Sequence, residues 1–246
     1  MTGNHGGSRV SAVWRRRLAT GGALALALLV VAGCAYRGQI DQPITLKFTW
    51  FSYVAGDDIR AACAPGGQDS YRLIYNGSYR EQVRSYEVVG DGAGGGYYTA
   101  RVMRGSGLDL NRFSISDPQA VANWTVARSR LTAADMSALR AALAESGAFS
   151  NDGAGLRLAS EQFYWTAATC RDGQFHFNAW LYPSDRYARL RFPAALLGHD
   201  QTGVAVNAPR RVVPLEAARP VTREQDPVTR FNLRVGDDGL ITGPAL

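Results

Sequence analysis

Beyond its N-terminal segment, the chain contains two histidines, His176 and His199. A histidine can activate a hydroxyl nucleophile when a carboxylate orients it, and Thr169 and Asp172 lie near His176 in the sequence. However, the sequence contains neither a Gly-x-Ser-x-Gly elbow nor a His-Glu-x-x-His motif. We interpret His176 as a hydrogen-bonded sheet histidine and expect His199 in a solvated loop. The sequence assigns no catalytic residue and favours a protein without enzymatic activity.

Cys34 follows Val31-Ala32-Gly33 and ends an apolar stretch that begins after Arg15-Arg16-Arg17. The uninterrupted apolar run, residues 23–32, is shorter than the about 20 residues that a membrane-spanning helix needs. These features resemble the signal peptide and lipobox of bacterial lipoproteins. The resemblance implies cleavage before Cys34, a diacylglycerol on its sulfur and a further acyl chain, such as palmitate, on its amine. An uncleaved anchor, an ordinary cleaved signal peptide or a twin-arginine signal are the alternatives.

The same resemblance implies a location in the bacterial cell envelope. Two or more acyl chains anchor a protein stably in a membrane. Because Ala35 rather than aspartate follows the lipidated cysteine, the resemblance implies the outer membrane, facing the periplasm, if the organism has one. Residues 1–33 would be the signal peptide, and residues 34–43 would be the lipidated cysteine with a short tether.

Cys63 and Cys170 remain once Cys34 is lipidated, and the space outside the cytoplasmic membrane is oxidising. We therefore expect a disulfide between them. A redox or metal pair is the alternative, but no Cys-x-x-Cys is present, and the spacing to His176 and His199 is not that of a zinc site. We expect no metal and no cofactor.

The formal net charge of +6 gives little information about partners. Four arginines lie before Cys34, and the rest of the chain carries 23 basic and 21 acidic residues. This balance argues against nucleic acid as a partner. The size of the mature part predicts one globular domain over residues 44–235, with an exposed linker at 214–228 and a loose tail at 236–246.

Turn signals and β-rich stretches predict a mainly antiparallel sheet. The expected strands are residues 44–54, 71–75, 79–89, 97–103, 113–115 and 231–235. A hairpin turn at Asn76-Gly77 would place Arg72 opposite Glu81. The glycine-rich stretch 90–96 lacks the Gly-Lys-Ser/Thr of a phosphate-binding loop, so we interpret it as a flexible hairpin loop.

The clearest expected helix is residues 133–146. Thr132 and Asp135 have capping-box spacing, and Gly147 suits a left-handed stop. Its apolar stripe is typical of a face that packs on the core. Shorter helices are expected at residues 59–63 and 193–197. The predicted fold class is α+β, mainly antiparallel, with one principal helix and one disulfide.

Asp172-Gly173 between two apolar runs predicts a hairpin in which Trp165 faces Trp180 and Thr169 faces His176. Side chains alternate across a strand. One face, which includes Cys170, should lie on the core with Cys63 packed against it. The other combines aromatic and polar residues and is the candidate binding face: Phe163, Trp165, His176, Asn178, Trp180 and Tyr182. Alternatively, these aromatics lie under another element and stabilise the sheet.

The leading functional hypothesis is an envelope lipoprotein that binds another protein or the cell wall without catalysis. The second is an envelope hydrolase that acts on peptidoglycan or glycan with a site assembled from distant residues. The third is a carrier of small apolar ligands, which would need a cavity in the sheet.

Overall fold

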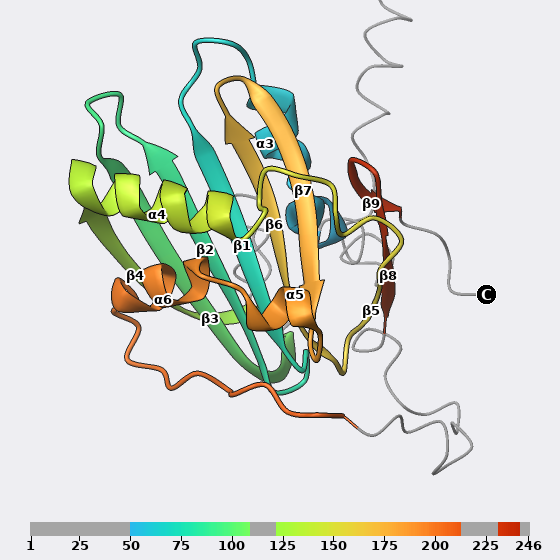
Figure 1. Ribbon diagram of the computed structural model, residues 1–246. Helices are drawn as coiled ribbons and strands as arrows, with labels where there is room; N and C mark the ends of the chain where they lie inside the picture. The colour runs from blue at the N-terminus through green and yellow to red at the C-terminus, as the bar shows by residue number, and fades with distance from the viewer. Residues whose placement is uncertain (1–49, 109–121, 213–230, 242–246) are drawn as a thin grey trace, which may run out of the picture. The chain divides into compact units, whose positions relative to one another are not determined.

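The computed structural model describes residues 50–108, 122–212 and 231–241. A six-stranded antiparallel sheet organises this part of the chain, with the strand order β4-β3-β2-β1-β6-β7 (Figure 1). Its strands are β1 (Ser70–Gly77), β2 (Gln82–Gly90), β3 (Gly96–Leu108), β4 (Ala122–Leu131), β6 (Phe163–Arg171) and β7 (Gln174–Leu181).

Helices cover one face of this sheet (Figure 1). They are α4 (Ala133–Glu145), α5 (Asp185–Ala188) and α6 (Phe192–Gly198), and α4 begins at the expected capping box of Thr132 and Asp135. The buried core on this face joins sheet aromatics with apolar residues of α4 and α6: Tyr71, Tyr86, Tyr98, Trp165, Trp180, Met136, Leu139, Leu143, Phe192 and Leu196. The expected fold class, with one principal helix, is confirmed.

The opposite face carries a second core. The helical residues 50–55, helix α3 (Asp57–Ala62) and a three-stranded sheet of β5 (Arg157–Ala159), β8 (Asn232–Gly236) and β9 (Gly239–Ile241) contribute to it. Its buried residues include Val54, Ile59, Ile74, Val83, Tyr164, Ala168, Phe177, Leu233 and Val235. Because both faces are covered, β1 and β6 are buried along nearly their whole length instead of alternating between core and solvent.

The β6–β7 hairpin has the predicted register. Trp165 lies opposite Trp180, and Thr169 lies opposite His176. Asp172 and Gly173 both have positive φ values, 52° and 74°, as the two-residue turn of a hairpin requires. As expected, the face that includes Cys170 packs against α3 and Cys63.

The predicted register of the β1–β2 hairpin is wrong. Arg72 lies opposite Glu87, not Glu81, because the turn is at residues 78–81 and not at Asn76-Gly77. The buried Asn76 side chain is held inside β1, where its Nδ2 donates to the backbone oxygens of Ser160 and Gln162 at 2.9 and 2.6 Å. An asparagine held in this way is not free to form a turn.

Two further expectations differ from the structure. Residues 50–54, expected in a strand, are helical because Trp50 and Tyr53 lie three residues apart and pack together on the sheet, where the Tyr53 hydroxyl lies 2.5 Å from Ser85 Oγ. Gly236-Asp237-Asp238-Gly239, expected to begin a loose tail, forms the turn between β8 and β9. The predicted strand 113–115, the linker 214–228 and residues 1–49 lie outside the described residues.

The β6–β7 turn allows a matched test of backbone packing. Gly173 and Gly66 have similar left-handed φ values, 74° and 77°, but an added Cβ at Gly173 would lie 2.4 Å from the backbone nitrogen of Pro65, whereas none of the described atoms lies within 4 Å of one at Gly66. We expect Gly66→Ala to lower the free energy of unfolding by about 1 kcal/mol through strain alone, and Gly173→Ala by about 2–4 kcal/mol. If urea denaturation gives the same loss of unfolding free energy for both variants, Pro65 moves aside without an energetic cost.

Candidate functional site

Four of the six residues of the candidate binding face lie in the core, and the other two, His176 and Tyr182, are partly buried. Phe163, Trp165, Asn178 and Trp180 are all at most 4% exposed. Trp165 and Trp180 each pack on Phe192 of α6, with ring centroids 5.2 Å apart. The expectation of an exposed binding face is therefore wrong, and the alternative, that another element covers these aromatics, describes the structure.

The polar members of that face make structural contacts. Asn178 Nδ2 donates to the Gly147 backbone oxygen at 2.6 Å, and Trp180 Nε1 donates to the Ser146 backbone oxygen at 3.1 Å. Tyr182, which is half-buried, packs edge-on against Tyr187. These contacts hold the segment after α4 and the segment of α5 against the sheet.

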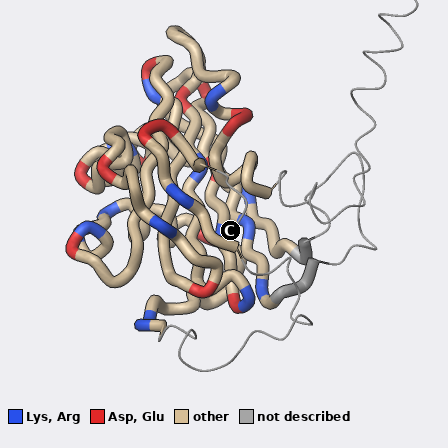
Figure 2. The backbone as a smooth tube through the Cα atoms, turned by 90° about the vertical axis from the view of Figure 1, so that its right-hand side faces the viewer, with Lys and Arg blue, Asp and Glu red and all other residues tan. Residues whose placement is uncertain are grey.

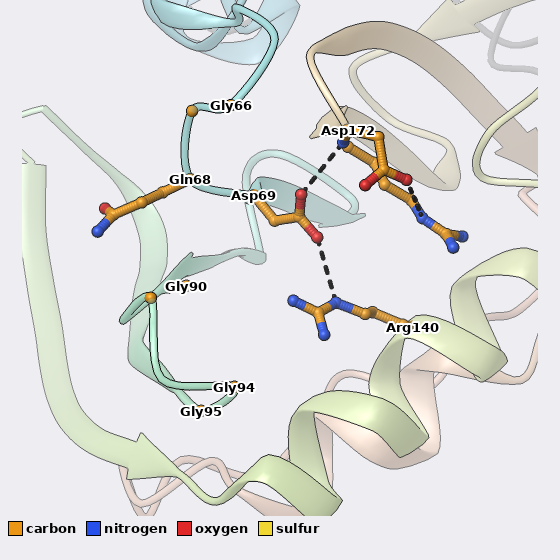
Figure 3. A pocket seen from close by; sticks show the side chains of 11 residues that line it. Gly66, Gln68, Asp69, Gly90, Gly94, Gly95, Arg140 and Asp172 are labelled. Atoms are coloured by element: carbon orange, nitrogen blue, oxygen red, sulfur yellow. Dashed lines mark hydrogen bonds and ion pairs between the residues drawn. The ribbon is translucent and has the colours of Figure 1, made fainter.

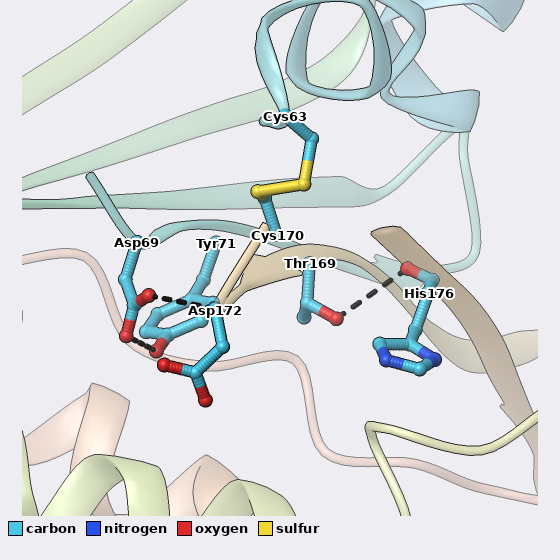
Figure 4. The surroundings of a disulfide bond; sticks show 7 residues. All are labelled: Cys63, Asp69, Tyr71, Thr169, Cys170, Asp172 and His176. Atoms are coloured by element: carbon cyan, nitrogen blue, oxygen red, sulfur yellow. Dashed lines mark hydrogen bonds between the residues drawn. A yellow bond between two sulfur atoms is a disulfide. The ribbon is translucent and has the colours of Figure 1, made fainter. Parts of the chain in front are cut away.

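The described structure does not assemble a triad around His176. Thr169 Oγ1 donates to the backbone oxygen of His176 at 3.4 Å, while the His176 ring packs edge-on against Phe149. Asp172 lies apart from the imidazole, and its side chain is 82% exposed (Figure 4). His199 does not lie in a solvated loop: it is half-buried at the end of α6, with Nε2 3.7 Å from Asp135 Oδ1.

The predicted disulfide between Cys63 and Cys170 is present, with their Cα atoms 5.6 Å apart (Figure 4). It joins Cys63, which directly follows α3, to Cys170, the last residue but one of strand β6. The chain that leaves Cys63 is therefore held beside the β6–β7 turn. Residues 66–69 then lead from this crosslink directly into β1.

A polar depression of about 400 Å³ is lined in part by Arg171 and Asp172, which directly follow Cys170 of the disulfide (Figure 3). Four segments line it: residues 66–69 before β1, the glycine loop between β2 and β3, Arg140 on α4, and Arg171-Asp172 in the β6–β7 turn. The glycine loop is not merely a connection, because Gly92 and Gly94 adopt φ values of 76° and 96° and the Asp91 amide donates to the Gly95 oxygen at 3.0 Å. These turns bring backbone, instead of side chains, to the edge of the depression.

Asp69 connects three of these segments. Its Oδ2 accepts a hydrogen bond from the Tyr71 hydroxyl at 2.7 Å and lies 3.2 Å from Arg140 Nε, and its Oδ1 accepts the Asp172 backbone amide at 3.2 Å. Burial raises the pKa of the Tyr71 phenol far above its usual value, so the phenol stays protonated as a donor. Desolvation lowers the pKa of Arg140, but the partners Tyr71 and Asp69 outweigh it and raise that pKa overall.

The groups that line the depression suit recognition of a polar ligand. The described lining residues are glycines, Gln68, two aspartates and two arginines. They offer charges and hydrogen bonds, and none is a serine, threonine, cysteine or histidine that could serve as a neutral nucleophile or imidazole base. Among the described residues, no cluster of three His, Cys, Asp or Glu side chains could hold a metal ion.

The sequence predicted residues 90–96 as a flexible hairpin loop and Asp172 as a turn residue, but it did not indicate that these and the other charged residues form one site. Arg140 follows Met136 by four residues and precedes Leu143 by three, so it lies at the edge of the apolar stripe of α4. A charged residue in that position is a signal that could have indicated a specific partner. Asp69 gives no such signal because Arg140 and the Asp172 amide, which it contacts, come from distant parts of the chain.

Comparison of this chain with protein-family models, with curated proteins and with solved structures finds no match. None of the helices in the described ranges is both long and apolar enough to cross a membrane.

Proposed function

We propose that this protein is a membrane-anchored envelope lipoprotein whose mature domain binds a partner without catalysis. The observation that carries the proposal is the polar depression, where two arginines, two aspartates and glycine backbone converge from four segments. The disulfide supports an oxidising location, which agrees with export from the cytoplasm. The partner would be another envelope protein or the cell wall.

Lipidation at Cys34 gives the first test. We expect the protein to incorporate labelled palmitate and to sediment with membranes, whereas Cys34→Ser should lose the label and fail to be anchored, because no thiol remains for the diacylglycerol. Gel fluorography and membrane fractionation measure both properties. Cys63→Ala is the matched control and should keep the label. Label retained on Cys34→Ser would refute the anchor.

Binding at the depression is tested by site-specific photo-crosslinking in intact cells. Gln68 lines the depression and is exposed, so a crosslinking residue placed there should capture a discrete partner. Val206 is 40% exposed and does not line the depression, so it provides the control position. Capture from Gln68 alone supports the proposal. Capture of the same species from both positions, or from neither, contradicts it.

The depression also carries the observation that favours the second candidate, an envelope hydrolase. Asp69 and Asp172 both line it, and paired carboxylates can share acid and base roles. Asp69, however, already accepts hydrogen bonds from Tyr71 and from the Asp172 amide and pairs with Arg140. Release of soluble fragments from purified peptidoglycan, abolished by Asp172→Asn, would establish this candidate over binding. The polar lining gives no support to the third candidate, a carrier of apolar ligands.

A further inference from the structure

The Arg140 guanidinium is held so that one edge of it faces the depression. Its Nε is fixed between Asp69 Oδ2 at 3.2 Å and the Tyr71 hydroxyl at 3.4 Å. Figure 3 shows the two terminal nitrogens directed away from Asp69 and toward the glycine loop. Within the described part of the chain these two nitrogens have no hydrogen-bond partner. A planar pair of N–H donors in this position matches a carboxylate.

The glycine loop gives this guanidinium an open approach. Gly90, Gly92, Gly94 and Gly95 line the depression without side chains. At Gly95 a Cβ would lie 2.6 Å from the Leu131 backbone oxygen, so a larger residue would displace the loop. A ligand next to Arg140 would thus lie against peptide groups, which can add hydrogen bonds of fixed direction.

The charges that line the depression balance. Arg140 and Arg171 are matched by Asp69 and Asp172, and Asp172 Oδ2 lies 3.3 Å from Arg171 Nε. A phosphate dianion at Arg140 would leave the depression with a net charge of about −2, whereas a ligand of zero net charge keeps the balance. A ligand that carries one carboxylate and one ammonium group matches this balance, with the carboxylate at Arg140 and the ammonium near the 82% exposed carboxylate of Asp172.

We propose that the depression binds the zwitterionic end of an amino acid or peptide, with Arg140 holding the carboxylate and Asp172 the ammonium group. This inference rests on the proposed binding function and names the ligand class. Free amino acids offer this chemistry, and so does a cell-wall peptide whose terminal diamino acid has an unlinked amine and carboxylate. The two sources differ in size, and the probes below separate them.

The test is calorimetric titration of the purified mature lipoprotein in detergent. The probes are D-alanine, a disaccharide-tripeptide that ends in meso-diaminopimelate, the same tripeptide with its free amine acetylated or its carboxylate amidated, and inorganic phosphate. We expect at least one zwitterionic probe to bind, and each blocked form to bind at least tenfold more weakly. Binding of D-alanine alone identifies free amino acids as the source, and stronger binding of the tripeptide identifies the cell wall.

Variants of Arg140 locate the site. Arg140→Lys keeps a positive charge beside Asp69 but loses the two-pronged donor, so it should weaken binding of the zwitterionic probe at least tenfold while circular dichroism and the melting temperature stay close to the parent values. Arg128→Lys, on the exposed surface of β4, is the matched control and should bind like the parent.

Three results would overturn the inference. One is that no zwitterionic probe binds at millimolar concentration. Another is that phosphate or the blocked peptides bind as well as the free ones, and the third is that Arg140→Lys binds like the parent. If the probes fail while Gln68 still captures a discrete envelope partner, the ligand class is wrong but the proposed binding function stands.

Discussion

Replacing both Cys63 and Cys170 by alanine is expected to lower the free energy of unfolding by about 4–5 kcal/mol. The two cysteines are 107 residues apart, so the crosslink removes a long closed loop from the unfolded ensemble, for which the chain-entropy model gives about 4–5 kcal/mol. Urea denaturation monitored by tryptophan fluorescence measures the loss. If the free energy of unfolding of the parent is no larger than this loss, the double variant would be largely unfolded at 37 °C.

The reduced parent protein provides the matching control. Reductant should bring it to the stability of the double variant and leave the double variant unchanged. Cys34→Ser, which retains the disulfide, should unfold like the parent. A loss below about 1 kcal/mol would mean that the unfolded chain is already restricted near these residues.

Asp200→Ala is expected to cost about 3–5 kcal/mol because it leaves a buried cation without its counter-charge. Arg84 is 1% exposed, and its Nη1 donates to Asp200 Oδ2 at 2.6 Å; the same oxygen accepts the Tyr86 hydroxyl at 2.9 Å. The pair also holds the extended segment after α6 against the sheet, where Gln82 Nε2 donates to the Ala205 oxygen. Thermal and urea unfolding measure the cost.

Two comparisons test whether the stranded charge is the cause. Arg84→Met combined with Asp200→Leu removes both charges and should recover much of the loss. Asp237→Ala, at an exposed turn, should change stability by less than about 0.5 kcal/mol. If the combined variant is no more stable than Asp200→Ala, packing and not charge accounts for the cost.

The loss of stability caused by Asp200→Ala should depend on pH. Desolvation raises the pKa of Asp200, but hydrogen bonds from Thr202 and Tyr86 and the charge of Arg84 outweigh it and hold that pKa below its usual value. A lowered folded-state pKa stabilises the protein above the unfolded value, about 3.9, and this stabilisation disappears as the pH falls through the folded-state pKa. The difference between parent and Asp200→Ala should therefore shrink below about pH 4.

The parts of the fold that the sequence predicts correctly depend on contacts between residues that are close together in the chain. The Asp172-Gly173 turn fixes the β6–β7 register, and Thr132 with Asp135 fixes the start of α4, each within a few residues. The β1–β2 register was not predictable in this way. It depends on Asn76 binding backbone oxygens more than 80 residues away, and no local pattern indicates that contact.

The candidate site, like the fold, was predictable only where contacts are local in sequence. Alternation along β6 and β7 correctly separated two faces, yet it gave no information about what covers them, and α6 buries Trp165 and Trp180. The depression needs Asp69, Arg140 and Asp172 from three separate elements. Their proximity follows from the order β2-β1-β6-β7 and from the disulfide, which the residue types alone do not determine.

The position of β8 near the end of the chain affects the order in which the second core can form. β8 is the central strand of its sheet, and its Leu233 and Val235 are 3% and 1% exposed in the second core. Both cysteines of the disulfide emerge before this strand, because they precede it in the chain. Cys63 and Cys170 can therefore be joined on a chain whose second core still lacks β8 and β9, so the crosslink can form before the fold is complete.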